Sequence, residues 1–183
     1  MRLNKILKNA LLVISAGIIL TACATKKEVA VEAPKEEIKK EETKEEVTKI
    51  EKIAGQMQGD VYVGTDSVKY LADGVADRVF FATNESILTT ASRETLRAQA
   101  AWLRANSNIT VVLEGHADER GTREYNLALG ERRANAAKDY LMTYGVSSDR
   151  ITVISYGKER PVDSGSNPLA WSKNRRSVTV KAN

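Results

Sequence analysis

The stretch from Ile109 to Asn135, ITVVLEGHADERGTREYNLALGERRAN, decides the fold, because it joins a predicted strand, a polar loop and the start of a long helix. Ile109 to Leu113 is nearly all apolar and has the length of a strand in a sheet interior. The loop from Gly115 to Thr122 follows it. A helix is predicted from about Glu124 to Tyr144, and Gly145 is the residue type that commonly follows a helix end.

The flanking segments predict further elements of alternating type. Strands are predicted at Val61 to Val63, Arg78 to Ala82, Ile151 to Ser155 and Ser177 to Lys181. Helices are predicted from Thr89 or Thr90 to Asn106–Asn108, and from Pro168 to Lys173 with Asn167 as the cap. This order predicts an α/β fold class, a two-layer sandwich with helices packed on a mixed four- or five-stranded sheet.

The single cysteine of the chain, Cys23, ends the segment Leu20-Thr-Ala-Cys23. A basic start followed by an apolar stretch from Ala10 to Leu20 is typical of an export signal, and about eleven apolar residues are too few to span a bilayer. The segment resembles a bacterial lipobox, which implies removal of residues 1–22 and acylation of Cys23. An ordinary buried cysteine is the alternative. Ala24, the next residue, then implies an outer-membrane destination.

The segment 23–59 is predicted to be a lipidated N-terminus and a linker rich in Lys and Glu, with too few large apolar side chains to form a core. Residues 60–183 are predicted to form one domain. The formal charge of +4 falls to about +1 without the cationic residues of the signal, which argues against a nucleic-acid-binding surface.

Arg133 lies on the predicted apolar face of the second helix, four residues after Leu129 and four before Ala137. A guanidinium on a buried face needs an anion, and two sources are open. One is an internal bridge to Asp118 of the preceding loop. The other is a ligand: Arg133 would bind a carboxylate in a bidentate fork, and Asp118 would bind an ammonium. The pair therefore suits a zwitterion.

Other chemistry-bearing residues are weaker candidates. His116 is the single histidine and Cys23 the single thiol, so no metal site based on histidine or thiolate is expected. Glu114 and Asp118 could in principle form an acid/base pair for glycan cleavage, although carboxylates four residues apart around a glycine are common. The segment Asn174-Arg-Arg176 is explained by a structural role at a helix end.

Three segments are specific enough to indicate a family: Glu114 to Asn135, Ile154 to Pro161 (ISYGKERP) and Asn174 to Val180 (NRRSVTV). From about Val79 to the C-terminus, the chain resembles the OmpA C-terminal-like domain family, and within it the peptidoglycan-associated lipoproteins. This resemblance implies non-covalent binding of peptidoglycan through the diaminopimelate of its stem peptide.

The resemblance also implies roles for single residues. Asp118 and Arg133 match the positions that bind diaminopimelate. Positions that line the same groove are matched by Arg120, Gly121, Asn126 and Leu129. Thr83 and Asn84 depart from the family pattern, which usually has a second aromatic residue and an aspartate near the ligand. Asn84 keeps an acceptor oxygen but lacks the charge, so affinity or peptide preference is expected to differ.

The whole protein is therefore expected to be an outer-membrane lipoprotein with its domain in the periplasm, tethering the membrane to the cell wall. The resemblance implies membership of the Tol-Pal system in envelope integrity and cell division, with TolB and other Tol or OmpA-like envelope proteins as partners. No cofactor and no enzymatic activity are expected. A wall-binding lipoprotein outside Tol-Pal and a cell-wall hydrolase are the alternatives.

Overall fold

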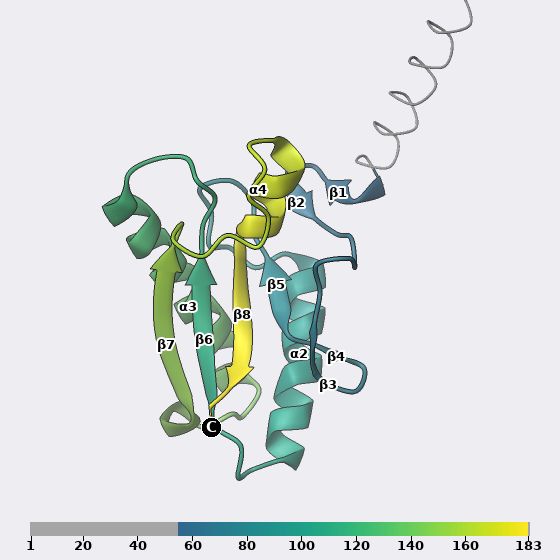
Figure 1. Cartoon of the computed structure of the whole chain (residues 1–183). Coiled ribbons are helices and arrows are strands. Elements are labelled where there is room, and N and C mark those ends of the chain that lie inside the picture. Colours follow the sequence, from purple (N-terminus) through teal and green to yellow (C-terminus); the bar gives the residue numbers. More distant parts are fainter. Residues whose placement is uncertain (1–54, 183) are drawn as a thin grey trace, which may run out of the picture.

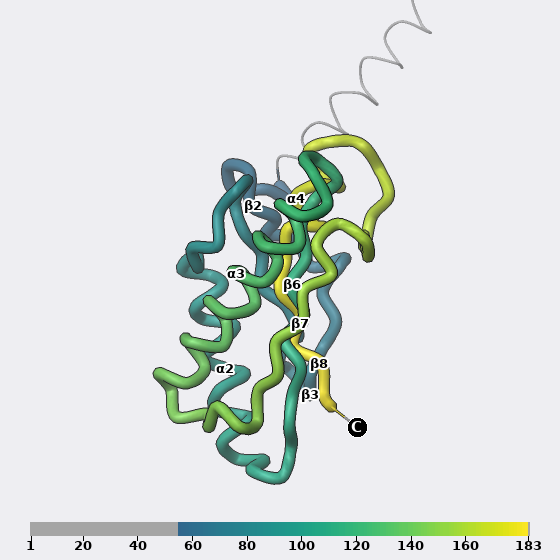
Figure 2. The backbone as a smooth tube through the Cα atoms, turned by 90° about the vertical axis from the view of Figure 1, so that its left-hand side faces the viewer, coloured from purple at the N-terminus to yellow at the C-terminus, as the bar shows by residue number. Residues whose placement is uncertain are grey.

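A computed structural model describes residues 55–182, which form a sheet with helices packed on one of its faces (Figure 1). The predicted signal peptide 1–22, Cys23 and the predicted linker up to residue 54 lie outside the described residues. Seen from the side, the two long helices lie in one layer and the sheet in the other (Figure 2). The predicted two-layer α/β fold is confirmed.

The main sheet has four strands in the order β5-β8-β6-β7. Their bounds are Arg78–Phe80 for β5, Val111–His116 for β6, Ile151–Gly157 for β7 and Arg176–Lys181 for β8. β6 runs parallel to β7 and antiparallel to β8, and β5 pairs antiparallel with β8. The sheet is therefore mixed, as predicted, and β6 lies in its interior.

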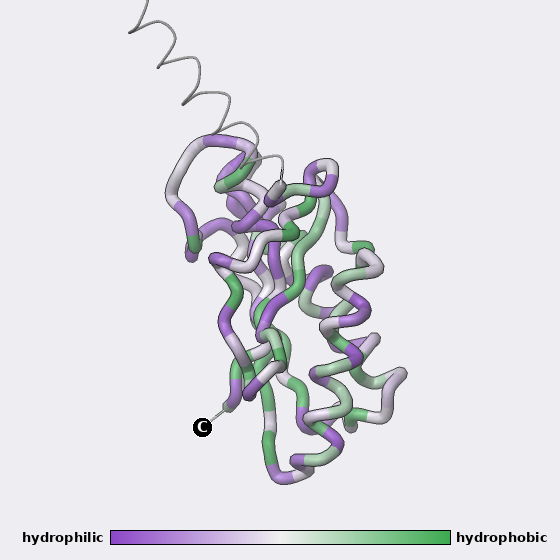
Figure 3. The backbone as a smooth tube through the Cα atoms, turned by 90° about the vertical axis from the view of Figure 1, so that its right-hand side faces the viewer, coloured by the Kyte–Doolittle hydropathy of each residue, from purple (hydrophilic) through white to green (hydrophobic). Residues whose placement is uncertain are grey.

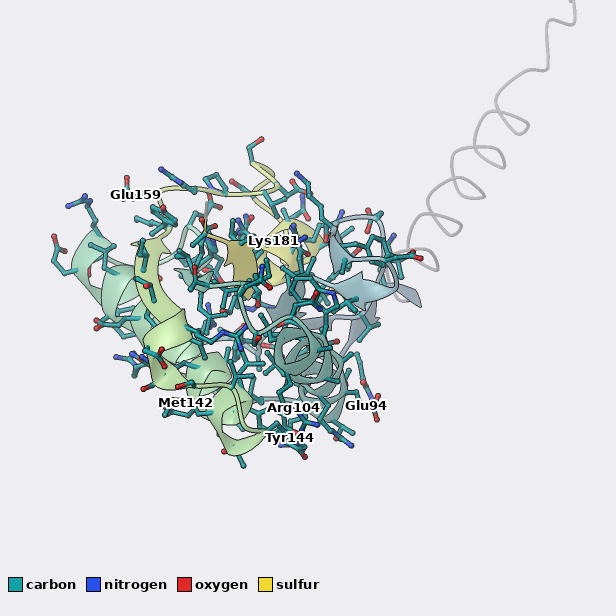
Figure 4. All side chains as sticks on the ribbon, turned by 90° about the horizontal axis from the view of Figure 1, so that it is seen from below. Glu94, Arg104, Met142, Tyr144, Glu159 and Lys181 are labelled. Carbon is teal, nitrogen blue, oxygen red and sulfur yellow. The ribbon has the colours of Figure 1, made fainter. Side chains whose placement is uncertain are left out.

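Helices α2 (Thr90–Ala105) and α3 (Arg123–Thr143) cover one face of the sheet. Each begins at a threonine cap: Thr89 accepts from the Ser92 backbone N–H, and Thr122 accepts from that of Tyr125. The apolar face of each helix meets alternate residues of the strands. The core between the layers includes Val79, Phe81, Leu96, Leu103, Val111, Leu113, Ala137 and Leu141. At the far end of the helices, Arg104 of α2 lies beside Tyr144 (Figure 4).

The smaller elements lie around the sheet. β1 (Met57–Gln58) pairs with β2 (Val61–Tyr62), and β3 (Tyr70–Ala72) pairs with β4 (Val75–Ala76). A 3₁₀ turn, η1 (Ser148–Arg150), precedes β7, and α4 (Pro168–Asn174) precedes β8. As predicted, Asn167 caps α4 through the Ala170 N–H. Within residues 55–182, no helix is both long and apolar enough to cross a bilayer.

The sequence-based prediction was wrong about one boundary that matters for function. The strand predicted at Ile109 to Leu113 begins at Val111 and continues through His116. The polar residues Glu114 and His116 therefore belong to the strand, where β7 and β8 on either side hold their backbone. The loop that carries Asp118 is correspondingly shorter than predicted. The β3–β4 pair was not predicted at all.

Helix α3 packs closely on the sheet because two glycines meet at the contact. A Cβ at Gly115 of β6 would overlap the carbonyl oxygen of Gly130 in α3. This close approach brings the buried face of α3, including Arg133, against the end of β6. The two glycines therefore help to set where the Arg133 guanidinium lies.

Replacing Gly115 by Ala should lower the free energy of unfolding by more than about 2 kcal/mol, since the helix must move away from the strand. Chemical denaturation followed by circular dichroism measures the change. Gly55→Ala is the matched control, because a Cβ there has no atom of residues 55–182 within 4 Å and should have little effect. Equal stability of the two variants would contradict the close packing described here.

Candidate functional site

The candidate site lies at the carboxyl end of β6, where the loop leading to α3 meets the turn between β5 and α2. Figure 3 shows that the loops at this upper end are mostly hydrophilic or neutral, whereas hydrophobic residues concentrate in the strands and the inner helix faces. The position follows from the topology, because the β6–α3 loop and the start of β8 lie at the same end of the sheet, where β6 finishes. Ligands in α/β folds commonly bind at such an edge.

Arg133 is fully buried on α3, as the helical spacing predicted. Its guanidinium donates three hydrogen bonds to backbone carbonyls: Nε to Glu85 at 2.8 Å, one terminal nitrogen to His116 at 2.8 Å, and the other to Ala82 at 3.0 Å. A guanidinium has five N–H donors, so two are not used by these bonds. The Phe81 ring lies 5.4 Å from the guanidinium carbon.

The charge of Arg133 is unpaired within the described part of the chain, where no carboxylate lies within ion-pair distance of its guanidinium. Burial and the nearby Arg175 lower its pKa to about 10, and the Asp118 charge acts in the opposite direction. The guanidinium is therefore still cationic at neutral pH. A buried cation held by carbonyl dipoles has a strong preference for an anion nearby.

Asp118 is also buried, and both of its carboxylate oxygens accept hydrogen bonds from arginines. Arg120 binds it through its backbone N–H at 3.1 Å, Nε at 3.0 Å and a terminal nitrogen at 2.7 Å. Arg175 adds a bond at 3.2 Å. Burial opposes ionisation of Asp118, but the hydrogen bonds from the two arginines hold its pKa below the usual range.

The internal Arg133–Asp118 bridge considered from sequence is not formed, because Asp118 pairs with Arg120 and Arg175 instead. The helix-end role predicted for Arg175 was therefore incomplete. Its Nε donates to the Phe81 carbonyl at 3.1 Å, and a terminal nitrogen donates to the Asp60 carbonyl. No pattern in the sequence indicated this, because the contacts depend on the antiparallel pairing of β5 with β8.

The loop that carries Asp118 is held from several sides. The Arg120 guanidinium stacks on Trp171 of α4 at 4.3 Å, and the Trp171 indole N–H donates to Glu119 at 2.9 Å. Lys158 donates to the Gly121 carbonyl at 2.7 Å, and Asn126 donates to the Arg120 carbonyl at 2.8 Å. The Asp118 carboxylate is therefore carried by a braced loop.

The remaining predicted site residues lie near these two groups, with different exposure. Gly121 has a φ of 88°, a value that favours glycine. Leu129 is buried on α3 one turn before Arg133. Thr83 donates its backbone N–H to Asp60 at 2.6 Å and accepts a long bond from Arg120 at 3.4 Å. Asn84 is exposed at a φ of 58°, in the left-handed region that Asn tolerates better than most residues.

The segment 82–85 thus links the two charged groups. Its carbonyls hold Arg133, and its Thr83 contacts both Arg120 and Asp60. The site therefore presents a cationic group, Arg133, and an acidic group, Asp118, to a ligand. Within residues 55–182, no three His, Cys, Asp or Glu side chains come together in a way that could hold a metal ion.

The sequence matches the model of a known protein family over the region that contains the two charged groups of this site. The OmpA family model matches residues 80–175, which run from the end of β5 through α4 and include Asp118, Arg133 and Arg175. The match covers more than half of the chain. The chain therefore belongs to the OmpA family.

Individual relatives that this chain resembles are named peptidoglycan-associated lipoproteins. A peptidoglycan-associated lipoprotein of Mesorhizobium japonicum is 54% identical over 106 residues, which cover 58% of this chain and 63% of the relative. One from Pasteurella multocida is 41% identical over 130 residues, covering 71% and 83%. The crystal structure of the peptidoglycan-associated lipoprotein from Burkholderia pseudomallei has a TM-score of 0.57 and 34% identity, covering 58% and 90%. The chain spans less than two thirds of the length of the Mesorhizobium relative.

Replacing Arg175 by Met should lower the free energy of unfolding by about 3 kcal/mol, because it leaves the buried Asp118 carboxylate and the Phe81 carbonyl with fewer donors. Urea denaturation measures this. Arg123→Met is the matched control, since Arg123 pairs with Glu159 in an exposed position and its loss should cost less than about 1 kcal/mol. A cost for Arg175→Met no larger than that of the control would contradict the bridging role of Arg175.

His116 predicts a pH dependence of stability. Its side chain is buried, and burial, followed by the charges of Arg176, Arg78 and Arg160, lowers its pKa to about 3. In the unfolded chain the His116 imidazole binds a proton near pH 6.5, whereas in the folded chain it does so only near pH 3. Unfolding should therefore become easier as the pH falls from about 6.5 toward 3, by about 2 kcal/mol at pH 5.

Urea denaturation at pH 7.5 and pH 5 tests this dependence, with His116→Gln as the comparison. Because His116 is the single histidine, the Gln variant should lose most of the difference between the two pH values. The same pH dependence in both proteins would contradict a neutral, buried His116.

Proposed function

We propose that the domain binds peptidoglycan non-covalently through the diaminopimelate of the stem peptide. The observation that carries the proposal is the fully buried, charged Arg133, which has two N–H donors left after its three carbonyl bonds. The likeness to peptidoglycan-associated lipoproteins supports the same function.

Diaminopimelate fits this chemistry because its side chain ends in a carboxylate and an ammonium on one carbon. The carboxylate binds the remaining donors of Arg133 in a charge-assisted pair. The ammonium binds Asp118. In the structure Arg120 holds both Asp118 oxygens, and its side chain is 43% exposed, so ammonium binding requires Arg120 to release one of them. Arg175 keeps its bond to Asp118.

The remaining predicted residues have supporting roles in this proposal. Gly121 and Asn126 shape the loop, Leu129 supports the helix below Arg133, and Thr83 and Asn84 face the peptide in place of the usual aromatic residue and aspartate. The proposal includes no catalytic step. Glu114, the acid suggested for a hydrolase, lies on β6 beside His116 at 3.4 Å, while Asp118 is held ionised by Arg120 and Arg175 and has no proton to donate.

The proposal for the whole protein is a tether. Residues 1–22 direct export, Cys23 carries lipid in the outer membrane, the linker runs from residue 23 toward β1, and the domain, which includes β1, binds the wall in the periplasm. As part of the Tol-Pal system in envelope integrity and cell division, it would use TolB and other Tol or OmpA-like envelope proteins as partners. Co-purification of TolB from cross-linked envelopes tests this assignment; wall binding without TolB would place the protein outside Tol-Pal.

Arg133→Lys should weaken binding of a muropeptide containing diaminopimelate at least tenfold, because an ammonium cannot reproduce the fork of the guanidinium. Isothermal titration measures the affinity, and circular dichroism checks the fold. The matched control is Arg132→Lys, one residue earlier and exposed, which should bind within twofold of the parent protein.

A second ligand sharpens this experiment. The same muropeptide with lysine in place of diaminopimelate keeps the ammonium but lacks the side-chain carboxylate, so it should bind at least tenfold more weakly to the parent protein. Equal binding of the two muropeptides, or undiminished binding by Arg133→Lys, would refute the assignment of Arg133.

A further inference from the structure

The sheet face opposite the helices carries a concave surface, separate from the Asp118–Arg133 site. This cavity of about 600 Å³ lies between β8, the end of β6, β3 and the segment that follows β7. Figure 2 shows β3 beside β8 on the side away from α2 and α3, and the segment between β7 and α4 curving over the same side. Lys181, which also lines the cavity, lies across the sheet from Met142 and Tyr144 (Figure 4).

Three arginines line this cavity: Arg78, Arg160 and Arg176. Arg176 is 6% exposed. Its terminal nitrogens make only long contacts, at 3.2 Å to the Arg160 carbonyl and 3.4 Å to the Asn174 carbonyl. Its Nε is buried without an acceptor among the described residues. A buried guanidinium N–H without an acceptor costs free energy and marks a place where an anion would be stabilised.

The acidic groups of the cavity do not balance this charge. The Asp77 carboxylate accepts two hydrogen bonds from Arg78, each of 2.8 Å. Glu114 has the neutral His116 ring as its hydrogen-bond partner, at 3.4 Å. Arg160 is exposed and stacks on the Tyr156 ring at 3.8 Å. The cavity therefore has an excess of positive charge that includes a deeply placed arginine.

Exposed apolar side chains lie around these charges. Tyr70 is 67% exposed, Val162 43% and Val180 39%, and all three line the cavity. Positive charge surrounded by exposed apolar side chains distinguishes a peptide ligand from a phosphate-rich one. A phosphate-rich surface would meet Glu114 and Asp77 at close range and would leave the apolar side chains in water. An extended peptide can place a single carboxylate on one face, with apolar residues two positions away on either side that cover the apolar side chains.

We propose that this cavity, formed by Arg78, Arg160 and Arg176 with Tyr70, Val162 and Val180, binds an extended acidic peptide segment of a partner protein. A Glu or Asp carboxylate of that segment accepts the Arg176 Nε–H and is also attracted by Arg160. Apolar residues two positions before and two positions after the carboxylate, which point to the same face of an extended segment, pack on Tyr70 and the two valines. The cavity lining includes neither Asp118 nor Arg133, so this site is separate from the proposed wall-binding site.

The test follows the Arg176 Nε–H directly by ¹H–¹⁵N NMR of the full chain in a non-ionic detergent. The probes are Ac-Val-Ser-Glu-Ser-Val-NH₂, which places both valines on the same face as the glutamate when extended, and its uncharged counterpart Ac-Val-Ser-Gln-Ser-Val-NH₂. The glutamate peptide should shift the Arg176 Nε–H resonance with a saturable curve. The glutamine peptide should bind at least tenfold more weakly.

Two variants keep the test independent of folding. Arg176→Gln should abolish the binding, and Arg160→Gln, at an exposed position, should weaken it at least threefold while circular dichroism and sacculus binding stay unchanged. Arg132→Gln, exposed on α3 and not part of the cavity lining, is the matched control and should bind like the parent protein.

Four outcomes would overturn the proposal. They are equal binding of the two peptides, no effect of Arg160→Gln, no shift of the Arg176 resonance by either peptide, and binding of pyrophosphate or phosphatidylglycerol vesicles in place of the glutamate peptide. The last outcome would assign the cavity to phosphate groups.

Discussion

The structure around the candidate site depends on burial of one guanidinium, that of Arg133. Its three hydrogen bonds go to carbonyls in two segments that are far apart in the sequence, Ala82 and Glu85 after β5 and His116 at the end of β6. These bonds fix the β5–α2 turn against the β6–α3 loop. Because they use carbonyl dipoles and not a carboxylate, they position the cation without neutralising it, and the charge remains available to a ligand.

A second charged group stabilises the same end of the sheet. Arg175 connects three segments, through the Phe81 carbonyl, the Asp118 carboxylate and the Asp60 carbonyl. Asp60 lies just after β1, so the beginning of the described chain is bound to the site and not only covalently joined to the domain. Asp118 is thereby held as an ionised acid by two arginines, Arg120 and Arg175. The two arrangements give the site opposite charges at fixed positions, which is what recognition of a zwitterion requires.

Much of the fold could be predicted because each main element has a clear local signal. The spacing of Leu96, Ala100 and Leu103 predicted α2, and the same spacing placed Arg133 on the buried face of α3. The contacts of Arg175 could not be predicted, because they exist only once β8 lies beside β5. The β3–β4 pair has two or three residues per strand, which is too short for a periodic signal. The boundary of β6 was missed because Glu114 and His116 are polar residues that neighbouring strands hold in place.

The two faces of the sheet have different roles in this account. The face covered by the helices forms the core, and Arg133 lies on α3 in this layer. The opposite face carries Arg78, Arg160 and Arg176 around the cavity. The account rests on the first of these, and a crystal structure of the protein with a bound diaminopimelate muropeptide tests it most directly. The account predicts a diaminopimelate carboxylate within hydrogen-bond distance of Arg133 and the ammonium at Asp118. Ligand density elsewhere on the domain, with Arg133 contacting only its three carbonyls, would contradict it.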